Sequence, residues 1–125
     1  MNFKILSCIF LIYLIVTPIL GSLIIVSDNA ATGERRQILI NLLTGTVANK
    51  KERGRLTPEQ LQKFIKVQVD LPILARDFPN DTKSIPDTIQ YIVVDTSNGI
   101  EIRWNQGHDN GNEDLQFIAR IIALD

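Results

Sequence analysis

The chain has 125 residues, 45% of them hydrophobic, and 13 Lys and Arg against 14 Asp and Glu give a net charge of −1. This balance provides no basic excess for nucleic acid or an anionic membrane, so we expect neither as a partner. The single cysteine, Cys8, excludes the intramolecular disulfides that stabilise many small secreted domains.

The N-terminal segment has the layout of a secretory signal peptide. Lys4 precedes an almost unbroken apolar run over residues 5–20, and small residues follow at Gly21 and Ser22. We therefore expect cleavage after Gly21, which makes residues 1–21 a signal peptide and residues 22–125 a single secreted, β-rich domain. Because apolar residues resume at 23–26, an uncleaved membrane anchor is the alternative.

Cleavage changes both the charge and the means of stabilisation of the mature chain. It removes Cys8 and Lys4, which leaves 104 residues without cysteine and a net charge of −2. A chain of this length buries about two-thirds of its unfolded surface, enough for one domain. The domain must fold on packing alone or gain stability from self-association, and in the second case we expect a homodimer built through an edge strand.

Two strands are predicted in the first part of the secreted domain. Residues 23–27 read as one strand, and residues 38–43 (ILINLL) fit either a strand, which we favour, or a helix that ends at Gly45. The only basic cluster follows and consists of Lys50, Lys51, Arg53 and Arg55. It is a solvated loop, a binding site for a sulfated glycan or phosphate, or a processing site of a secretory precursor.

A helix start is predicted at Thr57, where a Thr cap, Pro58 and Gln60 form a capping box. We expect one or two helical turns that end near Lys63. The apolar residues at alternate positions over 65–71 then predict a strand that stops at Pro72.

Asn80 begins the only N-glycosylation sequon of the chain, Asn80-Asp81-Thr82. Pro79 and Pro86 flank it, a composition typical of a loop. We expect an exposed loop and treat Asn80 as a candidate glycosylation site.

The clearest local signal is a β-hairpin over residues 88–105. Asn98 and Gly99 separate two runs rich in β-branched and aromatic residues, as a type I′ turn requires. With a two-residue loop, Val93 pairs with Trp104. Tyr91 and Trp104 are candidate core aromatics, with a ligand pocket or a partner contact as the alternative.

The last segment offers polar side chains without a catalytic pattern. His108 is the only histidine, and neither a nucleophile setting nor further zinc ligands accompany it. The oxygen-rich residues 109–114 read as a polar turn, and calcium binding is the alternative. We therefore assign no catalytic, cofactor or metal residue, and we read residues 115–124 as a buried last strand.

Together these elements predict a mainly β fold, a small antiparallel β-sandwich of about six strands with one short helix. The alternative is an α+β fold with helices near residues 34–44 and 58–71.

Three segments in chain order resemble an insect family. SLIIVSDNAATGER joins a short apolar strand to a charged turn, TIQYIVVDTSNGIEIRWNQG forms a hairpin that ends in Gly, and GNEDLQFIARI joins a Gly-polar loop to an aromatic-containing strand. This pattern resembles the insect multiprotein bridging factor two family, also called salivary secreted peptides. In this family a Gly-Gly pair is usual where the present chain has Gly107-His108. The segment LTPEQLQKF, with the signal layout, also resembles the secreted stress proteins of flies called Turandot.

The resemblance implies a small, single-domain secreted protein and supplies no catalytic residues. We therefore expect a non-enzymatic extracellular protein that acts by binding a protein or small molecule, in an immune, stress or salivary context, without a cofactor. The alternative is a precursor that is cut at residues 50–55 to release a signalling peptide. A membrane is expected as a partner only if the signal is uncleaved.

Overall fold

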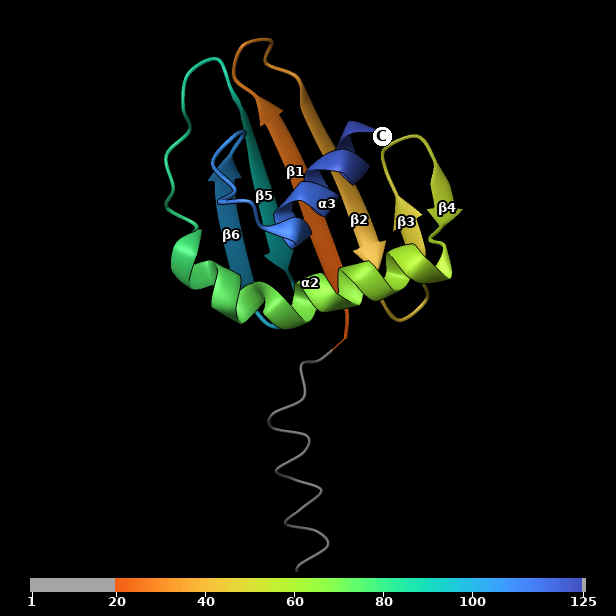
Figure 1. The fold of residues 1–125 in the computed structure, drawn as a ribbon. Helices are drawn as coiled ribbons and strands as arrows, with labels where there is room; N and C mark the ends of the chain where they lie inside the picture. Colours follow the sequence, from red (N-terminus) through yellow and green to blue (C-terminus); the bar gives the residue numbers. More distant parts are fainter. Residues whose placement is uncertain (1–19, 125) are drawn as a thin grey trace, which may run out of the picture.

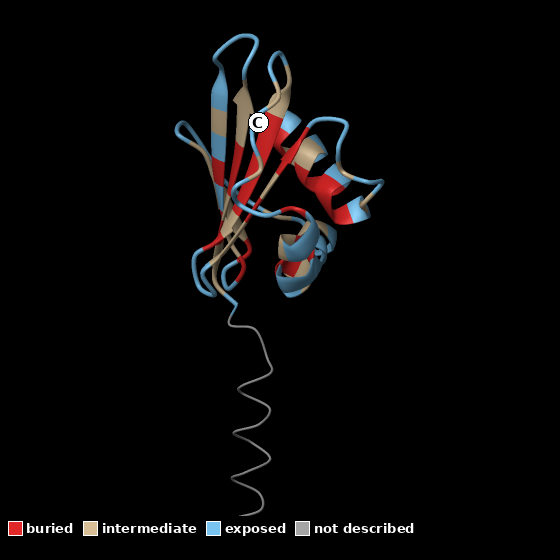
Figure 2. Cartoon of the chain, turned by 90° about the vertical axis from the view of Figure 1, so that its left-hand side faces the viewer, coloured by how far each residue is buried: buried red, intermediate tan, exposed pale blue. Residues whose placement is uncertain are grey.

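The computed structural model describes residues 20–124, which form one six-stranded antiparallel sheet with two helices on one of its faces (Figure 1, Figure 2). Residues 1–19, with most of the expected signal peptide and Cys8, lie outside the described part. The elements in chain order are β1 (Ser22–Asn29), β2 (Arg35–Asn41), β3 (Thr46–Ala48), β4 (Arg53–Arg55), α2 (Pro58–Asp77), β5 (Ile89–Asp95), β6 (Ile100–Asn105) and α3 (Glu113–Ala123).

β1 lies at the centre of the sheet, whose strand order is β4-β3-β2-β1-β5-β6. It pairs with β2 on one side and with β5 on the other. One core fills the space between the sheet and the two helices (Figure 2). Its largest fully buried side chains include Trp104, Phe64, Leu23, Ile25, Ile40, Leu71, Ile102, Leu115 and Ile118.

The prediction of a mainly β fold with six antiparallel strands is confirmed. The second layer, however, consists of α2 and α3 instead of a second sheet, because the segment expected as the last strand is the helix α3. Leu115, Ile118 and Ile122 recur at helical spacing and face the core. Asn112 caps this helix by accepting a hydrogen bond from the Leu115 amide at 3.2 Å.

The helix that begins at Pro58 is confirmed, together with both hydrogen bonds of its capping box. It continues to Asp77, so the strand expected over 65–71 is wrong and the alternative helix near 58–71 is right. Its buried residues, at helical spacing, are Phe64, Val67, Gln68, Leu71 and Leu74. The alternating pattern wrongly predicted a strand because it includes Val69 among the buried positions, whereas Val69 is 49% exposed. The alternative helix near 34–44 is wrong, since β2 occupies that segment.

The β5–β6 hairpin exists, but its register is shifted by two residues from the prediction. Tyr91 pairs with Trp104, and Val93 pairs with Ile102. The loop is longer because the Asp95 carboxylate accepts hydrogen bonds from the amides of Ser97 and Asn98, at 3.0 and 3.2 Å. Gly99 then closes the turn with a φ of 67°, a conformation that favours glycine.

The same turn chemistry occurs at two further strand connections. Asn29 and Asn41 each accept two backbone amides on their side-chain oxygen, as Asp95 does. In each turn a glycine four residues later, Gly33 or Gly45, donates to the backbone oxygen of the first residue. The pattern Asn/Asp-x-x-x-Gly therefore connects β1 to β2, β2 to β3 and β5 to β6.

Candidate functional site

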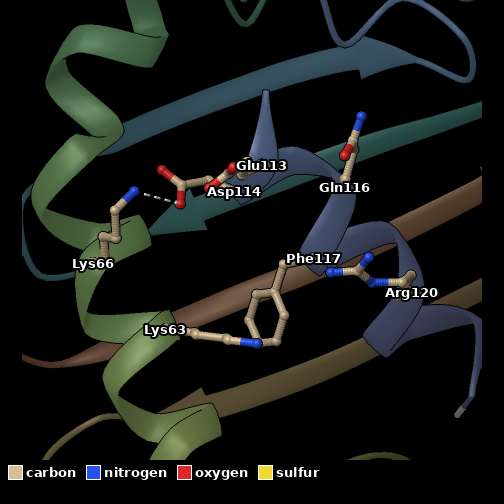
Figure 3. Close-up of a pocket in the computed structure, with 7 residues that line it drawn as sticks. All are labelled: Lys63, Lys66, Glu113, Asp114, Gln116, Phe117 and Arg120. Atoms are coloured by element: carbon tan, nitrogen blue, oxygen red, sulfur yellow. Dashed lines mark hydrogen bonds and ion pairs between the residues drawn. The ribbon is translucent and has the colours of Figure 1, made fainter. Parts of the chain in front are cut away.

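A groove between α2 and α3 is the candidate binding site (Figure 3). It encloses about 380 Å³. α2 contributes two lysines from the flank of its buried face, and the first two turns of α3 contribute the rest. The lining residues are Lys63, Lys66, Glu113, Asp114, Gln116, Phe117 and Arg120.

An ion-pair cluster closes one end of the groove. The Lys66 ammonium lies 3.0 Å from Asp70 Oδ2 on its own helix and 3.0 Å from Asp114 Oδ1 on α3. The Asp114 side chain is only 10% exposed, whereas the lysine is 62% exposed. The cluster therefore links α2 to the first turn of α3 through one cation and two carboxyl groups.

The cluster shifts the pKa of all three of its members. Burial, followed by a hydrogen bond shared with Asp70, raises the pKa of Asp114. That hydrogen bond and the nearby Lys66 lower the pKa of Asp70. Hydrogen bonds to Asp114 and Asp70 raise the pKa of Lys66, so its amine is held protonated. A lysine nucleophile or general base needs the opposite shift.

The other end of the groove presents cations around an aromatic ring. The Lys63 ammonium lies 5.3 Å from the centroid of the Phe117 ring, within the range of a cation–π contact. Phe117 is held by an edge contact with Phe64, whose ring centroid is 4.8 Å away. Arg120 follows one turn later on α3 (Figure 3). Within residues 20–124, neither Lys63 nor Arg120 forms an ion pair with a carboxylate.

The candidate aromatics Tyr91 and Trp104 lie in the core and do not reach the groove. Their rings stack at a centroid distance of 5.2 Å, and they are 8% and 2% exposed. Burial raises the pKa of Tyr91. Tyr91 also borders a second cavity of about 280 Å³ beside the end of α3. There Arg36 donates to the backbone oxygen of Ala123 at 3.0 Å.

The sequon and His108 lie on exposed turns. Asn80 is exposed, and the Thr82 amide donates to the backbone oxygen of Pro79 at 3.1 Å, which forms a tight turn around the sequon. The expectation that the sequon lies on an exposed loop is therefore met. His108 is exposed after β6. Within the described range no group of three or more His, Cys, Asp or Glu residues has a geometry that could hold a metal ion.

The basic cluster lies at the sheet edge that is formed by β3 and β4, away from the groove. Lys50 and Lys51 occupy the turn between these strands, and Arg53 and Arg55 are exposed on the edge strand. A shallow cavity of about 310 Å³ brings the two lysines together with Arg35 and Arg36 of β2. Neither this extension of the basic cluster nor the groove is among the features predicted from the sequence.

Two further findings complete the description. Of the helices in residues 20–124, neither is long and apolar enough to span a membrane. No family model, curated protein or solved structure matches the chain. The resemblance to the insect multiprotein bridging factor two family therefore stays a prediction.

Proposed function

We propose that the chain is a small secreted, non-enzymatic extracellular protein that acts by binding, and that its binding site is the groove between α2 and α3. The groove takes a group that combines an anionic end with an apolar body, carried by a protein or a small molecule. The immune, stress or salivary context comes from the family resemblance.

The observation that carries this proposal is that Lys63, whose ammonium lies over the Phe117 ring, and Arg120 line the same groove. These two cations have no carboxylate partner among the described residues, unlike the neighbouring Lys66. A half-enclosed site with an aromatic surface and a few charged groups is typical of ligand recognition. A carboxylate or sulfate between the two cations gains charge-assisted hydrogen bonds, while its apolar part lies on the ring.

The test is a titration of the isotopically labelled protein with phenylacetate as the probe, followed by NMR. We expect the amide signals of the residues that line the groove to shift with one binding curve. Arg120→Gln and Lys63→Gln should each weaken this binding about 5- to 20-fold, because each removes one charge-assisted contact. Lys50→Gln is the matched control, since it removes a cation from the edge of the sheet. Shifts centred on residues 35–51 in place of the groove would contradict the assignment.

Secretion is tested by the intact mass of the product that insect cells release into the medium. A single species that begins at Ser22, with or without a glycan at Asn80, is the expected result. A product with Met1 still attached in the membrane fraction would identify an uncleaved anchor and contradict the secreted form.

The second candidate function is a precursor that is processed at the basic cluster. The accessibility of Lys50, Lys51, Arg53 and Arg55 on a turn and an edge strand favours it. Fragments that end near Arg55 in the same mass measurement would support processing over an intact binding domain.

A further inference from the structure

We propose that the helix-free face of the sheet is the interface of a homodimer, in which two copies pack sheet against sheet around a two-fold axis parallel to the strands. This inference does not depend on the groove, which lies on the opposite, helical side of the sheet (Figure 2, Figure 3).

The central strands are apolar on both faces. Leu23 and Ile25 of β1 point into the core under the helices, so the alternate residues Ile24 and Val26 lie on the other face. On β5, Ile92 and Val94 lie beside them, since they pair with Val26 and Ile24. A strand that has solvent on one face normally alternates apolar and polar residues, whereas continuous apolar runs are typical of strands covered on both faces.

Part of this face is covered by the chain itself. The segment between α2 and β5 lies over the far end of β5 and β6, where Gln90 donates to the backbone oxygen of Thr82 and Asn105 donates to that of Lys83. The row through Ile24 has no such cover from the described residues. Leu39, which pairs with Ile24, is 43% exposed.

The uncovered row takes one residue from each of the six strands. The pairing registers place these residues side by side in the order Arg53, Ala48, Leu39, Ile24, Val94 and Glu101. Four apolar residues thus lie between a cation at the β4 edge and, at the β6 edge, the Glu101 carboxylate, which also lies 3.4 Å from the Arg103 guanidinium of its own strand. An apolar centre with a charged rim is the usual composition of a protein–protein interface.

This row is complementary to itself under one symmetry operation. A two-fold axis parallel to the strands, between β1 and β2, places β4 of one copy over β6 of the other. Arg53 then faces Glu101 of the second copy, and Leu39 faces Ile24. Two rows away on the same face, Arg35 faces Asp28, because these two residues also pair across β1 and β2. A two-fold axis perpendicular to the strands would instead place β4 over β4, so that Arg53 of one copy would lie near Arg53 of the other.

The edges of the sheet are poorly suited to the alternative, a dimer formed by strand addition. β4 has three residues, all exposed, and two of them are arginines. The edge of β6 is partly occupied, since Pro79 bridges to Ile102 and the Arg103 amide donates to the backbone oxygen of Phe78 at 3.2 Å. Short, charged or covered edges are features that prevent strand addition.

The test is the mass in solution of the purified product of the full-length gene, measured by sedimentation over a range of concentrations. We expect a mass of two chains that dissociates on dilution. Leu39→Glu should raise the dissociation constant about 100-fold or more, because it buries a charge in the apolar centre. Leu43→Glu is the matched control: Leu43 is 72% exposed in the β2–β3 turn, outside the interface, and its replacement should leave the mass unchanged.

Charge reversal then tests the orientation of the two copies. Arg53→Glu and Glu101→Arg should each weaken the dimer, and the double variant should restore it, because each copy contributes one member of both pairs. A wild-type protein that remains monomeric at a concentration of about 100 µM would overturn the proposal. Failure of the double variant to recover the dimer, or an equal loss in Leu43→Glu, would also overturn it.

Discussion

Lys66, Asp70 and Asp114 link α2 to α3, and the pKa values of the two carboxyl groups are shifted in opposite directions. The lysine contacts both carboxyl groups at 3.0 Å, one on its own helix and one on α3. The buried Asp114 holds its proton more tightly than a free aspartate, and the more exposed Asp70 releases its proton more easily. The stability contributed by the cluster must therefore depend on pH.

Asp70→Ala should destabilise the protein at pH 7, and the difference from wild type should shrink under acid. The folded pKa of Asp70 lies below its ordinary value of 3.8, so its contribution is present above pH 3.8 and is lost as the pH falls through the folded value. Asp114, with a raised pKa, has the opposite dependence and remains present in both proteins. Urea denaturation midpoints at pH 7 and at about pH 2.5 measure the effect.

Asp77→Ala is the control for this prediction, because it also replaces an aspartate of α2 by alanine but lies at the end of the helix, outside the cluster. Its difference from wild type should not follow the pH dependence seen for Asp70→Ala. Equal losses for Asp70→Ala at both pH values would show that the carboxylate does not contribute through its charge.

At the scale of the elements, local sequence patterns correctly located helix starts and turns. They did not determine whether an apolar segment forms a helix or a strand, because that choice depends on packing. The capping box at Thr57 correctly located the start of α2, since its hydrogen bonds are local. The alternation over 65–71 could not reveal that the side of α2 away from the sheet also carries apolar residues. The apolar residues of segment 115–124 fit a strand and a helix equally well, because a short apolar run alone does not distinguish the two.

The hairpin illustrates a second limit. Asn98-Gly99 correctly located the turn, but the loop length depends on Asp95, whose side chain captures two amides of the loop. The repeated pattern Asn/Asp-x-x-x-Gly was present in the sequence and would have indicated three such connections. The groove was not predictable in this way, because Lys63 and Arg120 come from elements whose relative position only the packed core determines.

Pro72 lies inside α2 on its exposed side, and its replacement should stabilise the protein. A proline within a helix lacks the amide that would donate to the residue four positions earlier, here Gln68, and crowds its carbonyl. We expect Pro72→Ala to raise the free energy of unfolding by about 1–3 kcal/mol, measured by urea denaturation. Ile73→Ala, at a neighbouring exposed position, should change it by less than about 0.5 kcal/mol. A loss of stability in Pro72→Ala would indicate that the helix needs the bend.

At the scale of the whole molecule, a cut at the basic cluster would separate the chain into two parts that share a single hydrophobic core. Residues 22–55 supply β1 to β4, and residues 56–125 supply α2, β5, β6 and α3. The core side chains of β1 and β2, among them Ile25 and Ile40, pack with those of both helices. Neither part contains a complete core.

Cleavage in the turn at residues 50–52 should therefore leave the two pieces associated, whereas residues 56–125 alone should not fold. The isolated piece loses the strand that pairs with β5 and most of the surface that the helices cover. NMR spectra of the nicked protein and of the isolated piece measure the difference in signal dispersion. A well-dispersed spectrum of the isolated piece would contradict this and favour a stable processed product.

The central position of β1 also has a consequence for the order of events during synthesis. β1 is the first described strand to leave the ribosome, yet Ile25 pairs with Val93, 68 positions later. Contacts over such sequence separations slow folding, because a long loop must close before the contact is gained. Until β5 has been made, one edge of a strongly apolar strand stays open, so the newly made chain depends on chaperones for that interval more than a protein whose first strand lies at the edge of its sheet.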